Sequence, residues 1–558
     1  MRAFVRAGLA GAVIGVVIFV ADLVVTASTH GRHLDPSLET LALVAVVSVF
    51  VVLPCALIGG LLRLLGVQWE RATAKLALVA FVASSAGFFL FAERPVAPRD
   101  DLGITVEAGR PHDVIWIVID TLRADALHEG VGTAGELTFP DAPELGAFAE
   151  DCVVFTEAEA PSGWTIPSTA ALLTGIHPAS LGARAGLLPS AAHTVAELLR
   201  SAGYSTVAHI DNTLLSESNG FAAGFDRFEK RIPMDYGWNL ATSRLMPAAL
   251  RENVRHRMHI SYSGADRLFE RARADVDAAG DDPLFLYVHA MDVHAPYWSR
   301  LEDEAMARAA ADIPGLDGTG RDDARRSVNA LSESQRDAIR ALYQAELRTV
   351  DAEIGELLRH LDEVRGLSDA LVVVTSDHGE EFWEHGRMGH GHALWGEVVR
   401  VPLLMRLPDS LAQGTVARVD EPTSLIDVLP TVAELLELAV DGESLEFEGT
   451  SRVAALRGGV SPAAPLHAEQ FRFNRQIHRW RDKDLVLVRS NLPDERVEVR
   501  LFDVALDPNE RVDLSADRPE DVARLTAALE VHLASLDRDA RDAGEATQNA
   551  QGLEHLGY

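Results

Sequence analysis

The chain has 558 residues, of which 47% are hydrophobic and 24% charged, which excludes a long disordered or fibrous protein. Acidic residues outnumber basic ones by 83 to 51, so we do not expect a nucleic acid as a partner. The only two cysteines, Cys55 and Cys152, are too few for a disulfide scaffold or a cysteine zinc site.

Three apolar runs open the chain, at residues 7–25, 41–62 and 76–92. Each is long enough to cross, or nearly cross, a hydrocarbon core of about 30 Å as a helix. A cleavable signal peptide is the alternative for the first run, but two further runs favour a retained anchor. Basic residues next to a membrane-spanning run mark its cytoplasmic side. Their positions beside these runs predict that the N-terminus is cytoplasmic and that the catalytic region is extracytoplasmic. We therefore expect a multi-pass cell-membrane protein, with three transmembrane helices at 1–92 and a linker at 93–112.

From residue 113 onward, short apolar runs typical of buried strands alternate with amphipathic stretches typical of helices. The predicted strands are 113–120, 204–210, 283–290, 371–375 and 401–407. The longest predicted helix spans about 333–364, where apolar residues recur at spacings of three and four. This alternation predicts an α/β domain at 113–460, with a mostly parallel sheet sandwiched by helices.

The C-terminal part has a different pattern. Strands at 484–489 and 497–504 and a helix at about 519–536 predict a small α+β subdomain at 461–537. A polar tail follows at 538–558.

Carboxylates and imidazoles follow three of the predicted strands. They are Asp120 after the first strand, His289, Asp292 and His294 at the end of the third, and Asp377 and His378 after the fourth. Chemistry in such folds collects beyond the carboxyl ends of the strands, and these residue types bind divalent metals. Each residue alone could be a turn former, a helix cap or a core histidine. Their concurrence at matching strand ends favours a metal site.

Thr165 lies at or just before the start of a predicted short helix. Pro167 suits the first helical turn, and Gly175 suits the position after the last. Free N–H groups and the positive dipole end make a helix N-terminus an anion site. A hydroxyl there, beside a metal, could be deprotonated and attack phosphorus or sulfur. The alternative is that Thr165 only caps the helix, and the neighbouring metal constellation favours the nucleophile.

Five sequence blocks, in order, resemble the sulfatase family of the alkaline-phosphatase superfamily. They are IVIDTLRAD (117–125), TIPSTAALLTGIHP (165–178), FLYVHAMDVHAPY (285–297), SDHGEEFWEHG (376–386) and GHGHALWGEVVRVPLL (389–404). The resemblance covers about 113–558 and implies an alkaline-phosphatase-like fold. It also implies that Asp120, Asp377 and His378 bind a divalent cation, with Thr165 as the nucleophile on that metal.

The resemblance further implies that His294 lies near the leaving group, where it could act as an acid. His390 stands where many members have a lysine that contacts the substrate. We count His390, His392, Asp292 and His289 as candidate substrate-binding residues. Asp292, His294 and His390 or His392 could instead complete a second metal site, so one metal and two both stay open.

The departures from the family pattern bear on the mechanism. True sulfatases resemble C/S-x-P-S-R, in which the first residue becomes formylglycine and the arginine supports it. Here those positions are Thr165 and Thr169, and threonine cannot become formylglycine. The usual lysine-bearing block reads AHIDN at 208–212, and no lysine lies between Arg231 and Asp482. A threonine nucleophile is the pattern of similar phosphodiesterases and membrane phospho-headgroup transferases.

These observations lead to three hypotheses. The first is a metal-dependent hydrolase or transferase that cleaves a phosphate or sulfate ester through Thr165, with a phosphodiester-type substrate favoured and a lipid- or glycan-linked one among the options. The second is a sulfuric ester hydrolase without formylglycine, and the third is a non-catalytic membrane protein with a sulfatase fold.

The expected cofactor is a divalent metal ion held by Asp120, Asp377, His378 and Thr165. Oxygen ligands with one imidazole favour Mn²⁺ or Zn²⁺, with Ca²⁺ or Mg²⁺ as alternatives. The acidic composition argues against a polyanionic substrate unless a local basic pocket overrides it.

Overall fold

The computed structural model describes residues 104–106, 112–127, 137–181, 188, 192–230, 264–295, 297, 331–440, 443–444, 447–460, 464–472, 475–492 and 496–542. The three apolar runs predicted as a membrane anchor lie outside these residues. Within these ranges no helix combines the length and apolar character that a membrane crossing needs. Apart from Ser216–Ser218, the described residues belong to one compact unit.

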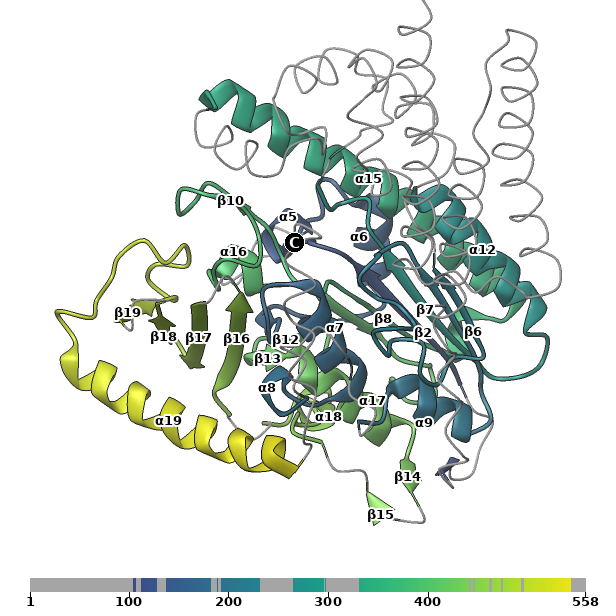
Figure 1. Cartoon of the computed structure of the whole chain (residues 1–558). Coiled ribbons are helices and arrows are strands. Elements are labelled where there is room, and N and C mark those ends of the chain that lie inside the picture. Colours follow the sequence, from purple (N-terminus) through teal and green to yellow (C-terminus); the bar gives the residue numbers. More distant parts are fainter. Residues whose placement is uncertain are drawn as a thin grey trace, which may run out of the picture. The chain divides into compact units, whose positions relative to one another are not determined.

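An eight-stranded sheet forms the centre of this unit (Figure 1). In spatial order its strands are β12 (Arg418–Val419), β3 (Val153–Phe155), β11 (Leu403–Arg406), β8 (Ala370–Thr375), β2 (Asp113–Ile119), β7 (Leu284–Ala290), β5 (Ser205–Ile210) and β6 (Arg227–Lys230). β11 runs antiparallel to both its neighbours, whereas all other adjacent pairs are parallel. The structure therefore confirms the mostly parallel α/β sheet.

Both faces of the sheet are covered, as the continuous apolar run of β2 predicts. Val114, Trp116 and Val118 pack on the side of α7 (Thr165–Thr174), α9 (Val195–Ser201) and α17 (Val428–Leu435). The alternate residues Ile115, Ile117 and Ile119 pack on the side of α6 (Pro143–Ala149), α12 (Ala265–Ala278) and α15 (Glu333–Val364). The sheet is thus the middle of three layers (Figure 1).

Helix α15 has the bounds that its apolar spacing predicts. Ser332 caps its N-terminus, because the side chain accepts the N–H of Gln335 while the Gln335 side chain accepts the N–H of Ser332. Ile339, Leu342 and Leu347 lie on its buried face. The helix is therefore held by packing along one side and by a defined cap at its start.

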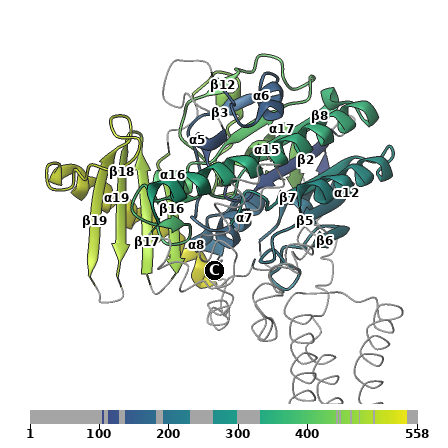
Figure 2. The ribbon, with the colours of Figure 1, turned by 90° about the horizontal axis from the view of Figure 1, so that it is seen from above.

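The C-terminal part is an antiparallel sheet with one long helix (Figure 2). Its strands follow one another in sequence as β16 (Leu466–Arg472), β17 (Arg475–Asp482), β18 (Leu485–Asn491) and β19 (Val497–Asp503). One face packs on α19 (Pro519–Asp542), and the other packs on residues around α16 (Gly396–Val399). Only β18 and β19 were predicted, so the sequence pattern missed half of this sheet.

Short strands complete the described structure. β1 (Ile104–Val106), within the predicted linker, pairs with β14 (Leu438–Val440), which pairs with β15 (Glu443–Ser444). β4 (Ala158–Glu159) pairs with β13 (Thr423–Ser424), and β9 (Glu381–Phe382) pairs with β10 (Met388–Gly389). α5 (Ala124–Leu127), α8 (Pro178–Leu181) and α18 (Val453–Leu456) are single-turn helices.

Candidate active site and metal centre

Three predicted metal ligands meet at one edge of the central sheet. Asp120 directly follows β2, and Asp377 and His378 follow the adjacent parallel strand β8. All three side chains are fully buried, and one ligand atom from each lies within 4.8 Å of the others. Parallel pairing explains the arrangement, because neighbouring parallel strands end at the same edge.

The environment of these side chains fits a bound cation. Asp120 Oδ1 and Asp377 Oδ2 are buried without a hydrogen-bond partner. They lie 3.9 and 3.6 Å, respectively, from His378 Nε2. Burial and the neighbouring charge of Asp120 raise the pKa of Asp377, and a cation between the two carboxylates would offset this effect. Two carboxylates and one imidazole suit a divalent metal.

The remaining atoms of the ligands are held in place. Asp377 Oδ1 accepts the backbone N–H groups of Thr121 at 3.3 Å and His378 at 2.9 Å. His378 Nδ1 donates to the carbonyl of Gly379 at 2.9 Å, which leaves Nε2 as the nitrogen that could bind a metal. Gly379 is required here, because an added Cβ would lie 2.2 Å from the Glu397 carbonyl oxygen.

Thr165 lies beside this triad as the first residue of α7. The N-cap is Trp164, and no side chain caps the helix, so the structure does not give Thr165 the capping role. Thr165 is 1% exposed, and its Oγ1 lies 3.5 Å from His378 Nε2. The hydroxyl, the uncapped helix start and the predicted metal site therefore share one location.

Asn212 and His289 surround the second oxygen of Asp120. Asn212 Nδ2 donates to Asp120 Oδ2 at 2.6 Å and lies 3.4 Å from Thr165 Oγ1. His289 Nε2 lies 3.3 Å from Asp120 Oδ2, and Tyr287 Oη lies 2.9 Å from His289 Nδ1. Although burial raises the pKa of Asp120, the hydrogen bond from His289 and nearby imidazoles lower it below its ordinary value. Asn212 is a site residue that the sequence reasoning missed, although it follows a predicted strand.

His294 and His390 form a second group next to the triad. The His390 ring lies 4.4 Å from the His378 ring and 5.1 Å from the His294 ring. Burial lowers the pKa of His294 to about 4 and also lowers the pKa of His390. His294 Nδ1 donates to the Ala295 carbonyl at 2.5 Å, so any proton transfer by His294 would take place at Nε2.

Two further candidate substrate-binding residues, Asp292 and His392, have hydrogen-bond partners outside the triad. Asp292 Oδ1 accepts the N–H of Ala265 at the start of α12, at 2.9 Å. His392 Nε2 bonds Glu381 Oε2 at 2.8 Å and lines a separate cavity. Among the described residues, Asp120, Asp377 and His378 are the only three potential metal ligands whose binding atoms all lie within 4.8 Å of one another.

Arg472 brings a positive charge to this region from the end of β16. Its guanidinium carbon lies 4.8 Å from the centre of the Trp164 ring. Its Nη1 would lie 2.5 Å from a Cβ at Gly391, where the backbone φ is +74°. Its charge also contributes to the lowered pKa of His390, after burial and His378. Nothing in the local sequence around Arg472 predicts this position.

Comparison with known proteins identifies the family. The sulfatase family model matches residues 112–438. The chain is 26% identical over 488 residues to choline-sulfatase of Rhizobium meliloti (strain 1021), covering 79% of this chain and 90% of that protein. It is 24% identical to the multifunctional alkaline phosphatase superfamily protein PehA of Trinickia caryophylli, covering 60% and 76%.

The fold agrees with this match. The phosphonate monoester hydrolase of Agrobacterium radiobacter superposes with a TM-score of 0.58 at 20% identity, covering 77% of this chain and 96% of that one. That likeness shows an alkaline-phosphatase-like fold. Since the family model spans more than half of the sequence, the chain belongs to the sulfatase family.

Proposed function

We propose that the protein is a metal-dependent hydrolase or transferase that cleaves a phosphate or sulfate ester through Thr165, with a phosphodiester-type substrate favoured. The observation that carries the proposal is the buried Thr165 hydroxyl, 3.5 Å from His378 Nε2 and at an uncapped helix start. The orphaned oxygens of Asp120 and Asp377 support a metal beside it and argue against a non-catalytic protein.

Each of the site residues has a separate role in the proposed reaction. A divalent cation held by Asp120, Asp377 and His378 would supply Lewis-acid activation of the hydroxyl and the ester. Thr165 Oγ1 forms a bond to phosphorus or sulfur while the bond to the leaving alkoxide breaks. Asn212 orients the attacking oxygen, and the first N–H groups of α7 face the developing negative charge.

Proton transfer falls to His294 in this proposal. Its Nε2 is unprotonated at neutral pH, because burial lowers the pKa of His294 to about 4. It must therefore take up the Thr165 proton before it passes one to the departing alkoxide. Water or a second alcohol then attacks the Thr165 ester, and Thr165 regains its proton.

A sulfate-ester substrate is the second candidate. The sequence relationship to a choline-sulfatase favours it. Threonine cannot become formylglycine, so the sulfatase mechanism that depends on formylglycine is not available to Thr165. The threonine hydroxyl therefore favours attack on phosphorus over attack on sulfur. We also propose that the three apolar runs anchor the protein in the cell membrane, with the catalytic region outside the cytoplasm and close to lipid- or glycan-linked esters.

Turnover by the full-length protein in detergent tests the proposal. The protein is loaded with Mn²⁺ or Zn²⁺ and given an aryl sulfate, a phosphate monoester and a phosphodiester. We expect Thr165→Ala to reduce turnover by on the order of a thousandfold, because the attacking oxygen is gone. Thr174→Ala, at the other end of α7, is the matched control and should retain turnover.

Intact-mass spectrometry adds a second readout. A rapidly quenched reaction should show one phosphoryl or sulfuryl group on wild-type protein and none on Thr165→Ala. Wild-type turnover by Thr165→Ala would refute the nucleophile, and the better-cleaved ester would identify the substrate class.

A further inference from the structure

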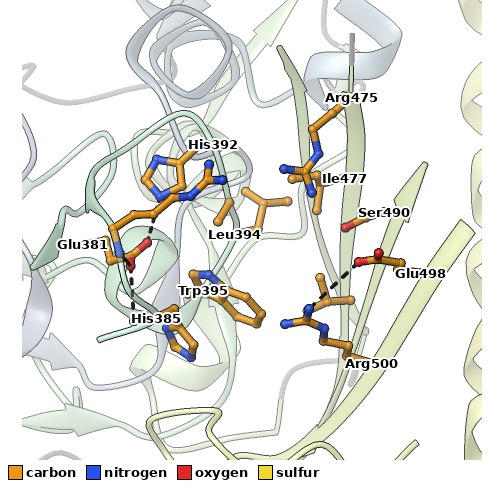
Figure 3. A pocket seen from close by; sticks show the side chains of 13 residues that line it. Glu381, His385, His392, Leu394, Trp395, Arg475, Ile477, Ser490, Glu498 and Arg500 are labelled. Carbon is orange, nitrogen blue, oxygen red and sulfur yellow. Dashed lines mark hydrogen bonds and ion pairs between the residues drawn. The ribbon is translucent and has the colours of Figure 1, made fainter. Parts of the chain in front are cut away.

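A cavity of about 190 Å³ lies between the segment around 381–395 and strands β17–β19 (Figure 3). Figure 3 shows His385, Leu394 and Trp395 on one wall, facing Arg475 and Arg500 on the other. The Trp395 ring stacks on the His385 ring at 4.1 Å. Because a single water needs only about 10–15 Å³, the cavity has room for an organic group.

The cavity carries more positive than negative charge. Arg387, Arg475 and Arg500 line it, against Glu381 and Glu498. Glu381 is already engaged, since it accepts His392 Nε2 at 2.8 Å and the N–H groups of His385 and Arg387.

The arginines of the cavity are only partly compensated. Arg475 Nε is buried without a hydrogen-bond partner, and Arg500 lies 3.9 Å from the Glu498 carboxylate. A guanidinium whose Nε–H is shielded from water and unused as a donor is stabilised by an oxyanion, whose oxygens match its planar fork.

The cavity adjoins the proposed active site. In the backbone register of the β16–β17 hairpin, Arg475 lies opposite Arg472. The Arg472 guanidinium lies over the ring of Trp164, the residue before Thr165. On the opposite wall, His392 is two residues from His390, whose ring lies 4.4 Å from the His378 ring. Residues 390–392 therefore contribute both to the group beside the triad, through His390, and to the lining of the cavity, through His392.

We propose that this cavity binds a second anionic group, a carboxylate, sulfate or phosphate, on the alcohol portion of the substrate ester. The inference rests on the proposed function and narrows its substrate class to esters whose leaving alcohol is itself negatively charged. The local charge thus overrides the acidic composition that argued against a polyanionic substrate.

A matched pair of substrates tests this selectivity. The probes are 4-(sulfooxy)benzoate and its methyl ester, or the corresponding phosphate esters if only those are cleaved. Wild type should have a higher kcat/KM for the free carboxylate. Arg475→Ala and Arg387→Ala should each lower the ratio of the two kcat/KM values about tenfold, because each removes a charge-assisted hydrogen bond.

The control is Arg489→Ala, on β18 but ion-paired with Glu530 of α19 and outside the cavity. It should leave the ratio unchanged, whereas Arg475→Lys should restore part of it. An unchanged ratio in both Arg475→Ala and Arg387→Ala would overturn the proposal.

Equilibrium binding separates this proposal from the proposed function. Calorimetry of the full chain with 4-hydroxybenzoate, the leaving group, needs no turnover. We expect about tenfold weaker binding by Arg475→Ala than by wild type, and similarly weak binding of neutral methyl 4-hydroxybenzoate by both. Equal affinity of wild type and Arg475→Ala for 4-hydroxybenzoate would refute the cavity assignment, even if Thr165→Ala proves inactive. If wild type turns over none of the esters but binds 4-hydroxybenzoate more tightly than Arg475→Ala does, the proposed function is refuted and the cavity assignment stands.

Discussion

Asn212 joins Asp120, the proposed metal ligand, to the hydroxyl that we propose as the nucleophile. Its Nδ2 donates to Asp120 Oδ2 at 2.6 Å and reaches Thr165 Oγ1 at 3.4 Å. Its Oδ1 accepts the N–H of Leu214 at 2.8 Å, which fixes the orientation of the amide. A single side chain therefore orients both components of the site, as outer partners of metal ligands commonly do.

We expect Asn212→Ala to weaken binding of Mn²⁺ and to slow turnover, each by roughly 10–100-fold, because Asp120 loses its orienting donor. Calorimetric titration of Mn²⁺ measures the first effect without any substrate. Asn491→Ala removes an equivalent amide on β18, which bonds Gln476, and serves as the control. Unaltered Mn²⁺ affinity in Asn212→Ala would show that Asn212 does not position the ligand.

Among the elements, β4 and β17 are joined by a cluster of buried ion pairs. Arg479 is fully buried and pairs with Glu159 at 3.2 Å and Glu510 at 2.6 Å. Arg481 pairs with Glu159 at 2.8 Å and with Glu157 at 2.7 Å. Removing one partner would leave an uncompensated buried charge, so the cluster ties the C-terminal sheet to the catalytic part.

This cluster predicts a particular pH dependence of stability. Although burial raises the pKa of Glu159, Arg479 and Arg481 lower it to about 2, below its ordinary value of 4.5. The ionised carboxylate therefore stabilises the fold fully above pH 4.5, and this contribution is lost as the pH falls through 2. The difference corresponds to on the order of 3 kcal/mol.

Urea denaturation of wild type and Glu159→Gln across this pH range measures the effect. Because Glu159→Gln cannot titrate, its free energy of unfolding should fall less steeply with decreasing pH. Parallel curves for the two proteins would contradict the assignment.

Sequence patterns predicted those helices and strands whose apolar spacing is typical of only one kind of element. β2, β7 and β8 are continuously apolar because both faces are buried, and α15 shows a regular spacing. β16 and β17 were missed because charged and polar residues occupy their buried positions, including Glu469, Arg479 and Arg481. The reversed direction of β11 was also not predictable, since its composition does not depend on the orientation of its neighbours.

Across the whole molecule, the predictable part of the site comes from the parallel strands. Asp120, Asp377 and His378 meet because their strands are adjacent and end at the same edge. Arg472 and Arg475 could not be predicted, because tertiary contacts between distant segments place them. The structure gives Asp292 and His392 other partners, and a strand end alone does not determine where a side chain points.

The proposed metal site also predicts a change in the stability of the entire chain. A cation that binds only the folded state, at one hundred times its Kd, adds about 2.7 kcal/mol. Differential scanning calorimetry should therefore show a Tm several degrees higher with Mn²⁺ or Zn²⁺ than with EDTA. Asp377→Asn, which lacks one ligand charge, should lose most of this difference. A wild-type Tm that is insensitive to both cation and chelator would refute the site.

The β16–β17 hairpin has a consequence for how this protein can diversify. Arg472 and Arg475 form its last strand pair, whereas Arg479 and Arg481, further along β17, hold the buried ion pairs with Glu159. Point substitution at Arg475 can therefore change which alcohol is accepted while those ion pairs and the strands before Asp120 and Asp377 are inherited intact. Relatives with the same catalytic residues are then expected to differ more at the end of this hairpin than along its strands.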